Sequence, residues 1–211
     1  MFQLLTLSSL PLFPLNAVLF PGGVLPLRVF EVRYLDMVRK CHRTGAPFGV
    51  VALADGHEVR QAGAPQESLH IVGTLAVIEQ LQDLQPGLMQ VRCRGTERFR
   101  VLHQQLLPHA LWMADVEQLP CDAQVRIPRD LQHTATMLAQ VSASLRERDP
   151  NTASHPQPSP TQLQNCGWVA NRWCELLPVP LELKQQLMQL DNPLVRLELV
   201  ADVLERTGIA L

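Results

Sequence analysis

Prolines spaced through an apolar run near the N-terminus constrain the fold of this chain more than any other feature. The run covers residues 10–37 and holds four prolines among bulky side chains, namely Pro11, Pro14, Pro21 and Pro26. Each proline fixes its own φ near about −65° and removes a backbone N–H, so the segment cannot form one helix. We predict two short strands, at residues 10–15 and 24–30, joined by a Phe20-Pro21-Gly22-Gly23 turn, with a helix following from Glu31.

The middle of the chain has the pattern of a sheet. Between residues 48 and 118 the apolar residues recur with a period near two, which is typical of strands. Turn signals interrupt this pattern at Pro86-Gly87 and at Arg94-Gly95-Thr96. Short strands separated by such turns indicate a barrel-like sheet, because closing a sheet removes its exposed edges.

The last third of the chain has the period of helices, beginning after Pro128. Residues 149–160 hold four prolines and no bulky apolar residue, which predicts a mobile loop. A capping box from Thr161 to Gln164 predicts the start of the next helix, and Asn192-Pro193 predicts the start of the last. We therefore expect a β pseudo-barrel over residues 1–120 and a helical bundle over residues 121–211.

Four segments carry a resemblance to a known family. Residues 10–37 resemble the opening motif of the N-terminal, substrate-binding domain of Lon-type ATP-dependent proteases, in its stand-alone form. Residues 73–78 and 91–99 are similar to the middle hairpins of that family, and residues 184–188 with Arg196-Leu197 are similar to its helical end. The resemblance implies an α+β fold, in which a PUA-like β pseudo-barrel with one internal helix precedes a C-terminal α-helical bundle. It also implies a module that recognises polypeptides in protein quality control.

Composition and charge exclude several classes of protein. Hydrophobic residues make up 46% of the chain and charged residues 18%, which is typical of a soluble globular protein. The formal net charge of −2 provides no overall attraction to nucleic acid or to anionic membranes. Residues 1–27 carry no charged side chain, but their prolines interrupt any membrane-spanning helix and no basic segment precedes the apolar part. We therefore expect a cytoplasmic protein, whose odd number of cysteines indicates free thiols.

The chain lacks the sequence patterns of the catalytic parts of a Lon protease. Its only lysines are Lys40 and Lys184, and neither lies in the Gly-Lys-Ser/Thr pattern that a phosphate-binding loop requires. A Ser–Lys dyad needs a lysine whose pKa burial has lowered, whereas both lysines lie in amphipathic segments beside polar residues, where we expect solvated amines. The histidines do not have the spacing of a zinc site. We predict neither a metal nor a cofactor nor an enzymatic activity.

Two turns are the candidate contacts for a polypeptide. A reader of unfolded or damaged chains needs an accessible apolar surface with few geometric demands. We place this surface at Phe20 and Leu88, because each lies at a turn where burial in the core is least assured. Phe20 packing under its own turn is an equally good interpretation. A protease or chaperone would be a natural partner of such a module.

Two alternative functions stay open at this point. Arg92, Arg94, Arg98 and Arg100 alternate with apolar residues around Gly95, so they are expected on one outer sheet face that could contact RNA phosphates. Nearby acidic residues and the absence of interleaved aromatic residues favour a solvated or ion-paired face instead. The second alternative is an adaptor or scaffold that binds a partner protein through its helical part.

Overall fold

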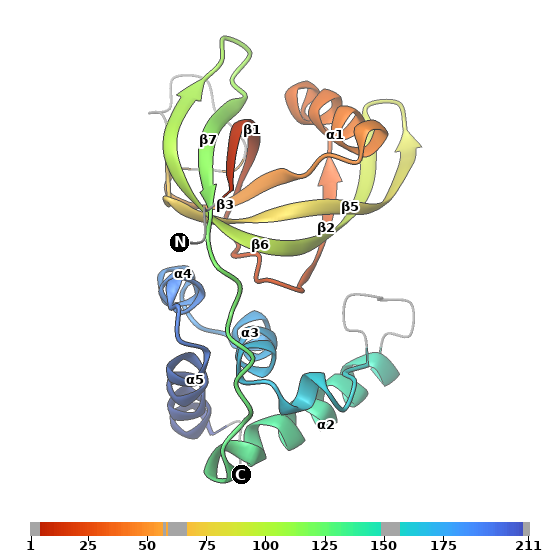
Figure 1. Cartoon of the computed structure of the whole chain (residues 1–211). Helices are drawn as coiled ribbons and strands as arrows, with labels where there is room; N and C mark the ends of the chain where they lie inside the picture. The colour runs from red at the N-terminus through yellow and green to blue at the C-terminus, as the bar shows by residue number, and fades with distance from the viewer. Residues whose placement is uncertain (1–4, 57, 59–66, 149–156, 209–211) are drawn as a thin grey trace. The chain divides into compact units, whose positions relative to one another are not determined.

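The computed structural model describes residues 5–56, 58, 67–148 and 157–208 (Figure 1). The chain divides into two compact units, residues Met1–Cys121 (unit 1) and Asp122–Leu211 (unit 2). Unit 1 contains the strands and one helix, and unit 2 contains the other helices, which confirms the predicted α+β class. Most of the segment predicted as a mobile loop, residues 149–156, lies outside the described residues.

The described part of unit 1 is a seven-stranded sheet with one helix. Its elements are β1 (Thr6–Leu15), β2 (Val24–Val29), α1 (Val32–Thr44), β3 (Phe48–Asp55), β4 (Ser68–Leu69), β5 (Val72–Gln85), β6 (Leu88–Leu106) and β7 (Trp112–Gln118). The strand order is β1-β7-β6-β5-β3-β4, and β1 also pairs in parallel with β3. This last pairing closes β1, β7, β6, β5 and β3 into a ring. Within the described residues β2 pairs only with β6 and β4 only with β3, so the sheet is not a simple barrel.

Strand β6 is the longest strand of unit 1 and serves two parts of the sheet. Along Met89–Arg94 it pairs with β2, and along Phe99–Leu106 it pairs with β7. The sequence predicted a turn at Gly95, but β6 continues through this residue. Gly95 is instead a point of close approach, because a Cβ there would lie 2.5 Å from the carbonyl oxygen of Phe20.

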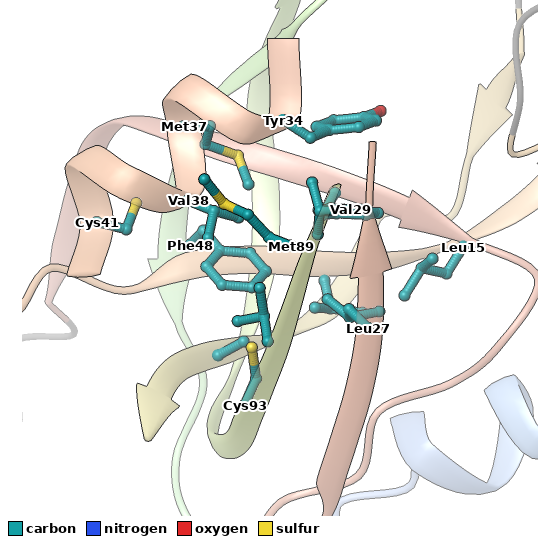
Figure 2. Close-up of a cluster of buried hydrophobic side chains, with 14 of the residues drawn as sticks. Leu15, Leu27, Val29, Tyr34, Met37, Val38, Cys41, Phe48, Met89 and Cys93 are labelled. Carbon is teal, nitrogen blue, oxygen red and sulfur yellow. The ribbon is translucent and has the colours of Figure 1, made fainter. Parts of the chain in front are cut away.

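Two hydrophobic clusters form the core of unit 1. One includes buried residues of the ring strands, among them Leu12, Phe99 and Trp112. The other includes residues of α1 and of the sheet, among them Val38, Val29 and Met89 (Figure 2). The helix predicted after Glu31 is present as α1, and its buried residues are Tyr34, Leu35, Met37, Val38 and Cys41.

Unit 2 is helical. Its α-helices are α2 (Gln132–Arg148), α3 (Cys166–Leu176), α4 (Leu181–Gln189) and α5 (Pro193–Thr207). Helix α5 begins as predicted, because the Asn192 side chain accepts hydrogen bonds from the backbone N–H groups of Leu194 (3.0 Å) and Val195 (3.4 Å). Gly208 follows its last turn with a φ of 64°, a left-handed conformation that glycine adopts without strain.

The predicted start of α3 is wrong by several residues. Thr161 makes no side-chain cap, and the helix begins at Cys166, where the Asn165 side chain accepts the N–H of Trp168 at 2.8 Å. A reciprocal pair of capping bonds does occur nearby, between Ser159 and Gln162. The pattern Ser/Thr-x-x-Gln occurs twice here, and the structure uses the earlier copy to close a short 3-10 turn.

A buried arginine connects the helices of unit 2. The guanidinium group of Arg196 on α5 donates to both carboxylate oxygens of Asp122, at 2.5 and 3.1 Å. It also donates to the side-chain oxygen of Asn171 at 2.9 Å and to the backbone carbonyls of Leu187 (2.9 Å) and Leu190. Gly167 lets Asp122 approach α3, because a Cβ at this position would lie 2.7 Å from a carboxylate oxygen of Asp122.

Candidate functional site

Phe20 does not lie on the surface. Its side chain is 0% exposed, and its carbonyl accepts the N–H of Gly23 at 2.9 Å to close the predicted turn. Gly22 has a φ of 76°, which is the conformation required at the third position of a type II turn. The turn is held on β6, because the N–H of Gly22 donates to Gly95 and the N–H of Gly95 donates to Gly23. Phe20 packs under its own turn and cannot contact a client in this conformation.

Leu88 is half-buried at the start of β6, and the register of β2 with β6 leads from it to Phe30 and not to Phe20. The β2–β6 ladder ends at the pair of Val29 and Met89, so Phe30 and Leu88 follow at the same end of it. Val29 is 1% exposed and Met89 0%, whereas Phe30 is 54% exposed. Because side chains alternate along a strand, Phe30 and Leu88 face away from the core that α1 covers.

Two further apolar side chains lie at this end of the sheet. Val32 is the first residue of α1 and is 73% exposed, and Leu84 is 43% exposed near the end of β5. Gln85 pairs with Leu88, which places Leu84 beside the start of β6. We call the β5–β6 hairpin and the strand β2 that pairs with it the arm of unit 1. We refer to Phe30, Val32, Leu84 and Leu88 at its end as the arm-end surface. Large exposed apolar side chains that gather in one region are a feature of binding surfaces.

The four arginines proposed for RNA do not share one exposed face. The Nε atoms of Arg92 and Arg94 both form ion pairs with Glu79, at 3.2 and 2.5 Å. Arg98 is only 4% exposed and donates to the carbonyl of Pro120 at 3.4 Å, whereas Arg100 is exposed. Two of the four guanidinium groups therefore share one carboxylate, and a third is buried.

The second lysine differs from its predicted environment. Lys184 is half-buried, and its ammonium group donates to the backbone carbonyl of Glu175 near the end of α3, at 3.1 Å. Burial lowers the pKa of Lys184 and raises the pKa of Glu175 to about 7, although Arg172 forms an ion pair with Glu175 at 2.9 Å. A lysine that bonds the last turn of a helix has a structural role.

One cavity of unit 1 brings together a serine, a histidine and an aspartate without forming a catalytic triad. This cavity of about 80 Å³ is lined by Ser9, His103 and Asp115 among others. The Asp115 carboxylate accepts the backbone N–H of Ser9 at 2.9 Å, and within the described residues no hydrogen bond joins the Ser9 hydroxyl to His103. A nucleophilic triad needs the serine hydroxyl within or near hydrogen-bond distance of the histidine ring.

Neither a metal site nor a membrane helix occurs in the part of the chain that the structure describes. No three His, Cys, Asp or Glu side chains of these residues gather in an arrangement that could hold a metal ion. No helix among the same residues is long and apolar enough to span a membrane.

Comparison with known proteins places the chain among substrate-binding domains. The model of the ATP-dependent protease La (LON) substrate-binding domain matches residues 9–206. A Lon protease of Anaeromyxobacter dehalogenans is 26% identical over 200 residues, which cover 94% of this chain but 23% of the protease. The crystal structure of a Lon N-terminal domain protein from Xanthomonas campestris is 34% identical, with a TM-score of 0.69, and the match covers 93% of this chain and 98% of that one. The N-terminal domain of a Mycobacterium avium complex Lon protease shares the fold at 16% identity, with a TM-score of 0.57 and a match that covers 92% of this chain and 97% of that one.

Proposed function

Because this chain belongs to the family of the Lon substrate-binding domain, we propose that it recognises polypeptide substrates without catalysing a reaction on them. We assign it to protein quality control in the cytoplasm, with unfolded or damaged chains as its clients. The chain spans about a quarter of the length of the Lon proteases that it matches, so the ATPase and peptidase activities of a protease are not part of this proposal.

The arm-end surface is the observation that carries the proposal. Unfolded chains differ from native ones mainly by the apolar side chains that they expose, so their reader needs apolar side chains of its own in solvent. Phe30 and Val32 are more than half exposed although they adjoin a well-packed core. Leu84 and Leu88 extend this surface across the hairpin between β5 and β6. In the proposed contact, Phe30, Val32 and Leu84 take the place of Phe20, and Leu88 is kept.

An adaptor function has one observation in its favour. Val195 (38% exposed) and Leu199 (42% exposed) lie one turn apart on α5, so unit 2 also presents an apolar pair to solvent. RNA binding loses support, because Glu79 already pairs with two of the four arginines and a third is buried. The arm-end surface and the Val195/Leu199 pair make the proposal testable with matched variants.

The test replaces Phe30 and Leu88 together by serine. We expect binding of a reduced and alkylated model protein to weaken by about 1–3 kcal/mol, or about 5–150-fold in Kd, because both apolar contacts are lost. The melting temperature should stay nearly constant, since Phe30 is 54% exposed and contributes little to the core. Fluorescence anisotropy with labelled client and a thermal melt on the same sample provide the measurements.

The matched control replaces Val195 and Leu199 by serine, which removes a similar apolar area from unit 2. This control should bind the client as the wild type does. The native form of the same client should bind at least tenfold more weakly than the reduced form. An unchanged affinity of the Phe30/Leu88 variant contradicts the site, and a loss of affinity in the control alone favours the adaptor function. A steep loss of binding with added salt would show that ionic contacts and not apolar ones hold the client.

A further inference from the structure

One edge of β5 has no strand beside it for much of its length. β5 pairs with β6 throughout, but it pairs with β3 only from Thr74 to Ala76. Among the residues that the structure describes, no strand pairs with the other edge of β5 from Val77 to Gln85. In Figure 1 this part of β5 is the yellow arrow that runs out beside the tip of the hairpin. An unpaired edge presents backbone N–H and C=O groups that can accept another strand.

A short regular stretch within this edge is suited to pairing. Bulges interrupt the β5–β6 ladder between Ile78 and Gln80 and again between Asp83 and Gln85. Between them, residues 80–83 keep one register with β6 in four successive pairs. Because the backbone groups of a strand alternate between its two edges, two of these residues direct an N–H and a C=O outward.

The core of unit 1 covers one face of β5 but not this edge. Ile78 and Leu81 pack against the hydrophobic cluster that α1 helps to form. The carboxylate of Asp83 lies 3.5 Å from the guanidinium of Arg39 on α1, so α1 lies over the same face. Gln80 and Gln82, which alternate with Leu81, are exposed. Among the described residues no strand pairs with the edge between these two faces, so a partner can reach it.

The edge of β2 is a natural comparison, because in the described part of the chain β2 pairs with β6 alone. Pro26 lies in the middle of β2 and has no N–H to donate, which is a common way to protect an edge strand. Residues 77–85 contain no proline. Of these two open edges, the one on β5 is therefore the better acceptor for a strand.

We propose that an extended segment of the client pairs with residues 80–83 of β5 as an additional strand. This inference rests on the proposed function and names the conformation of the client that unit 1 recognises. Backbone hydrogen bonds supply affinity that does not depend on the client's sequence, as a reader of many different chains requires. Leu84 follows the paired residues directly, so the same segment leads on to the arm-end surface. There its apolar side chains meet Leu84, Leu88 and Phe30.

The test uses a labelled ten-residue peptide of alternating valine and threonine and two N-methylated versions of it. One version is methylated at the odd residues and the other at the even residues, so each removes the N–H groups from one edge of the peptide strand. We expect one version to bind at least tenfold more weakly than the unmethylated peptide and the other to bind equally well. Amide exchange by NMR should slow at least tenfold at outward-facing residues within 80–83, and it should not change in β2.

Each outcome separates the mode of binding from the proposed function. Equal affinity of both methylated peptides overturns strand addition, and so does protection of β2 with unchanged exchange at residues 80–83. Failure of the unmethylated peptide to bind also overturns it. In each of these cases the proposed function stays intact if the wild type binds the reduced client protein and the Phe30/Leu88 variant does not. If the reduced client does not bind at all, the proposed function fails and strand addition fails with it.

Discussion

Replacing Arg196 by leucine should destabilise unit 2 far more than a typical point substitution. The arginine side chain is 1% exposed, and its guanidinium donates to Asp122, to Asn171 and to two backbone carbonyls. Leucine fills part of the volume but leaves the Asp122 carboxylate, which is 15% exposed, without its bidentate partner. Removing one partner of a buried ion pair costs about 3–5 kcal/mol, because the remaining charge is desolvated and uncompensated. We expect a loss of this size in the free energy of unfolding.

Urea denaturation followed by circular dichroism at 222 nm measures this loss, since most of the helices lie in unit 2. The double variant Arg196→Leu with Asp122→Ala is the matched control. It also removes the carboxylate that loses its Arg196 partner, so we expect it to recover about 1–3 kcal/mol relative to the single variant. A cost below about 1 kcal/mol for Arg196→Leu, or no recovery in the double variant, would refute the reasoning that the uncompensated charge dominates.

Two further predictions concern ionisable groups. Burial raises the pKa of Glu175 to about 7, so the folded state binds more protons than the unfolded state between about pH 4.5 and 7. Stability should therefore fall by about 1–3 kcal/mol as the pH rises through this range, and Glu175→Gln should flatten the slope in urea titrations at pH 5 and 8. Among the thiols, the exposed Cys121 should react with maleimide at least tenfold faster than the buried Cys93, whose pKa burial raises to about 12. Mass spectrometry of labelled peptides checks this order, and equal rates would contradict the described burial.

The elements that the sequence predicts best are those with local signals. Prolines and the Pro21-Gly22 turn separate β1 from β2, and an apolar stripe at helical spacing marks α1. Asn192 marks the start of α5 because its side chain can cap a helix whatever the rest of the fold does. These signals depend on neighbouring residues alone, so they can be detected without knowing the tertiary structure.

The predictions that failed depend on contacts between distant segments. Gly95 has the local pattern of a turn, but its function is to let the Phe20 turn approach β6 from 75 positions earlier in the chain. Lys184 lies among polar neighbours in the sequence, yet the fold brings it to the carbonyl of Glu175. No local pattern distinguishes such a glycine or lysine from one that is exposed.

The residues of the candidate surface likewise differ between what a local signal indicates and what depends on contacts between distant segments. Leu88 is proposed from its position after a turn, and the alternation of Leu27 and Val29 indicates that Phe30 faces outward. The proximity of Phe30 and Leu88 follows from the pairing of β2 with β6, which joins segments about 60 residues apart. The sequence pattern predicts a strand such as β2 but does not predict the strand with which it pairs.

The ring of strands in unit 1 has a consequence for biosynthesis. β1 pairs with β3, which follows soon after it, and with β7, whose last residue is Gln118. At about 5–20 residues per second, a ribosome needs roughly 5–20 s to add β7 after β1 has been made. During this time the apolar side chains of β1, among them Leu10 and Leu12, lack the strand that completes their burial. The nascent chain therefore exposes the same kind of apolar segment that we propose the finished protein to recognise, and it is itself a candidate for chaperone binding until β7 is in place.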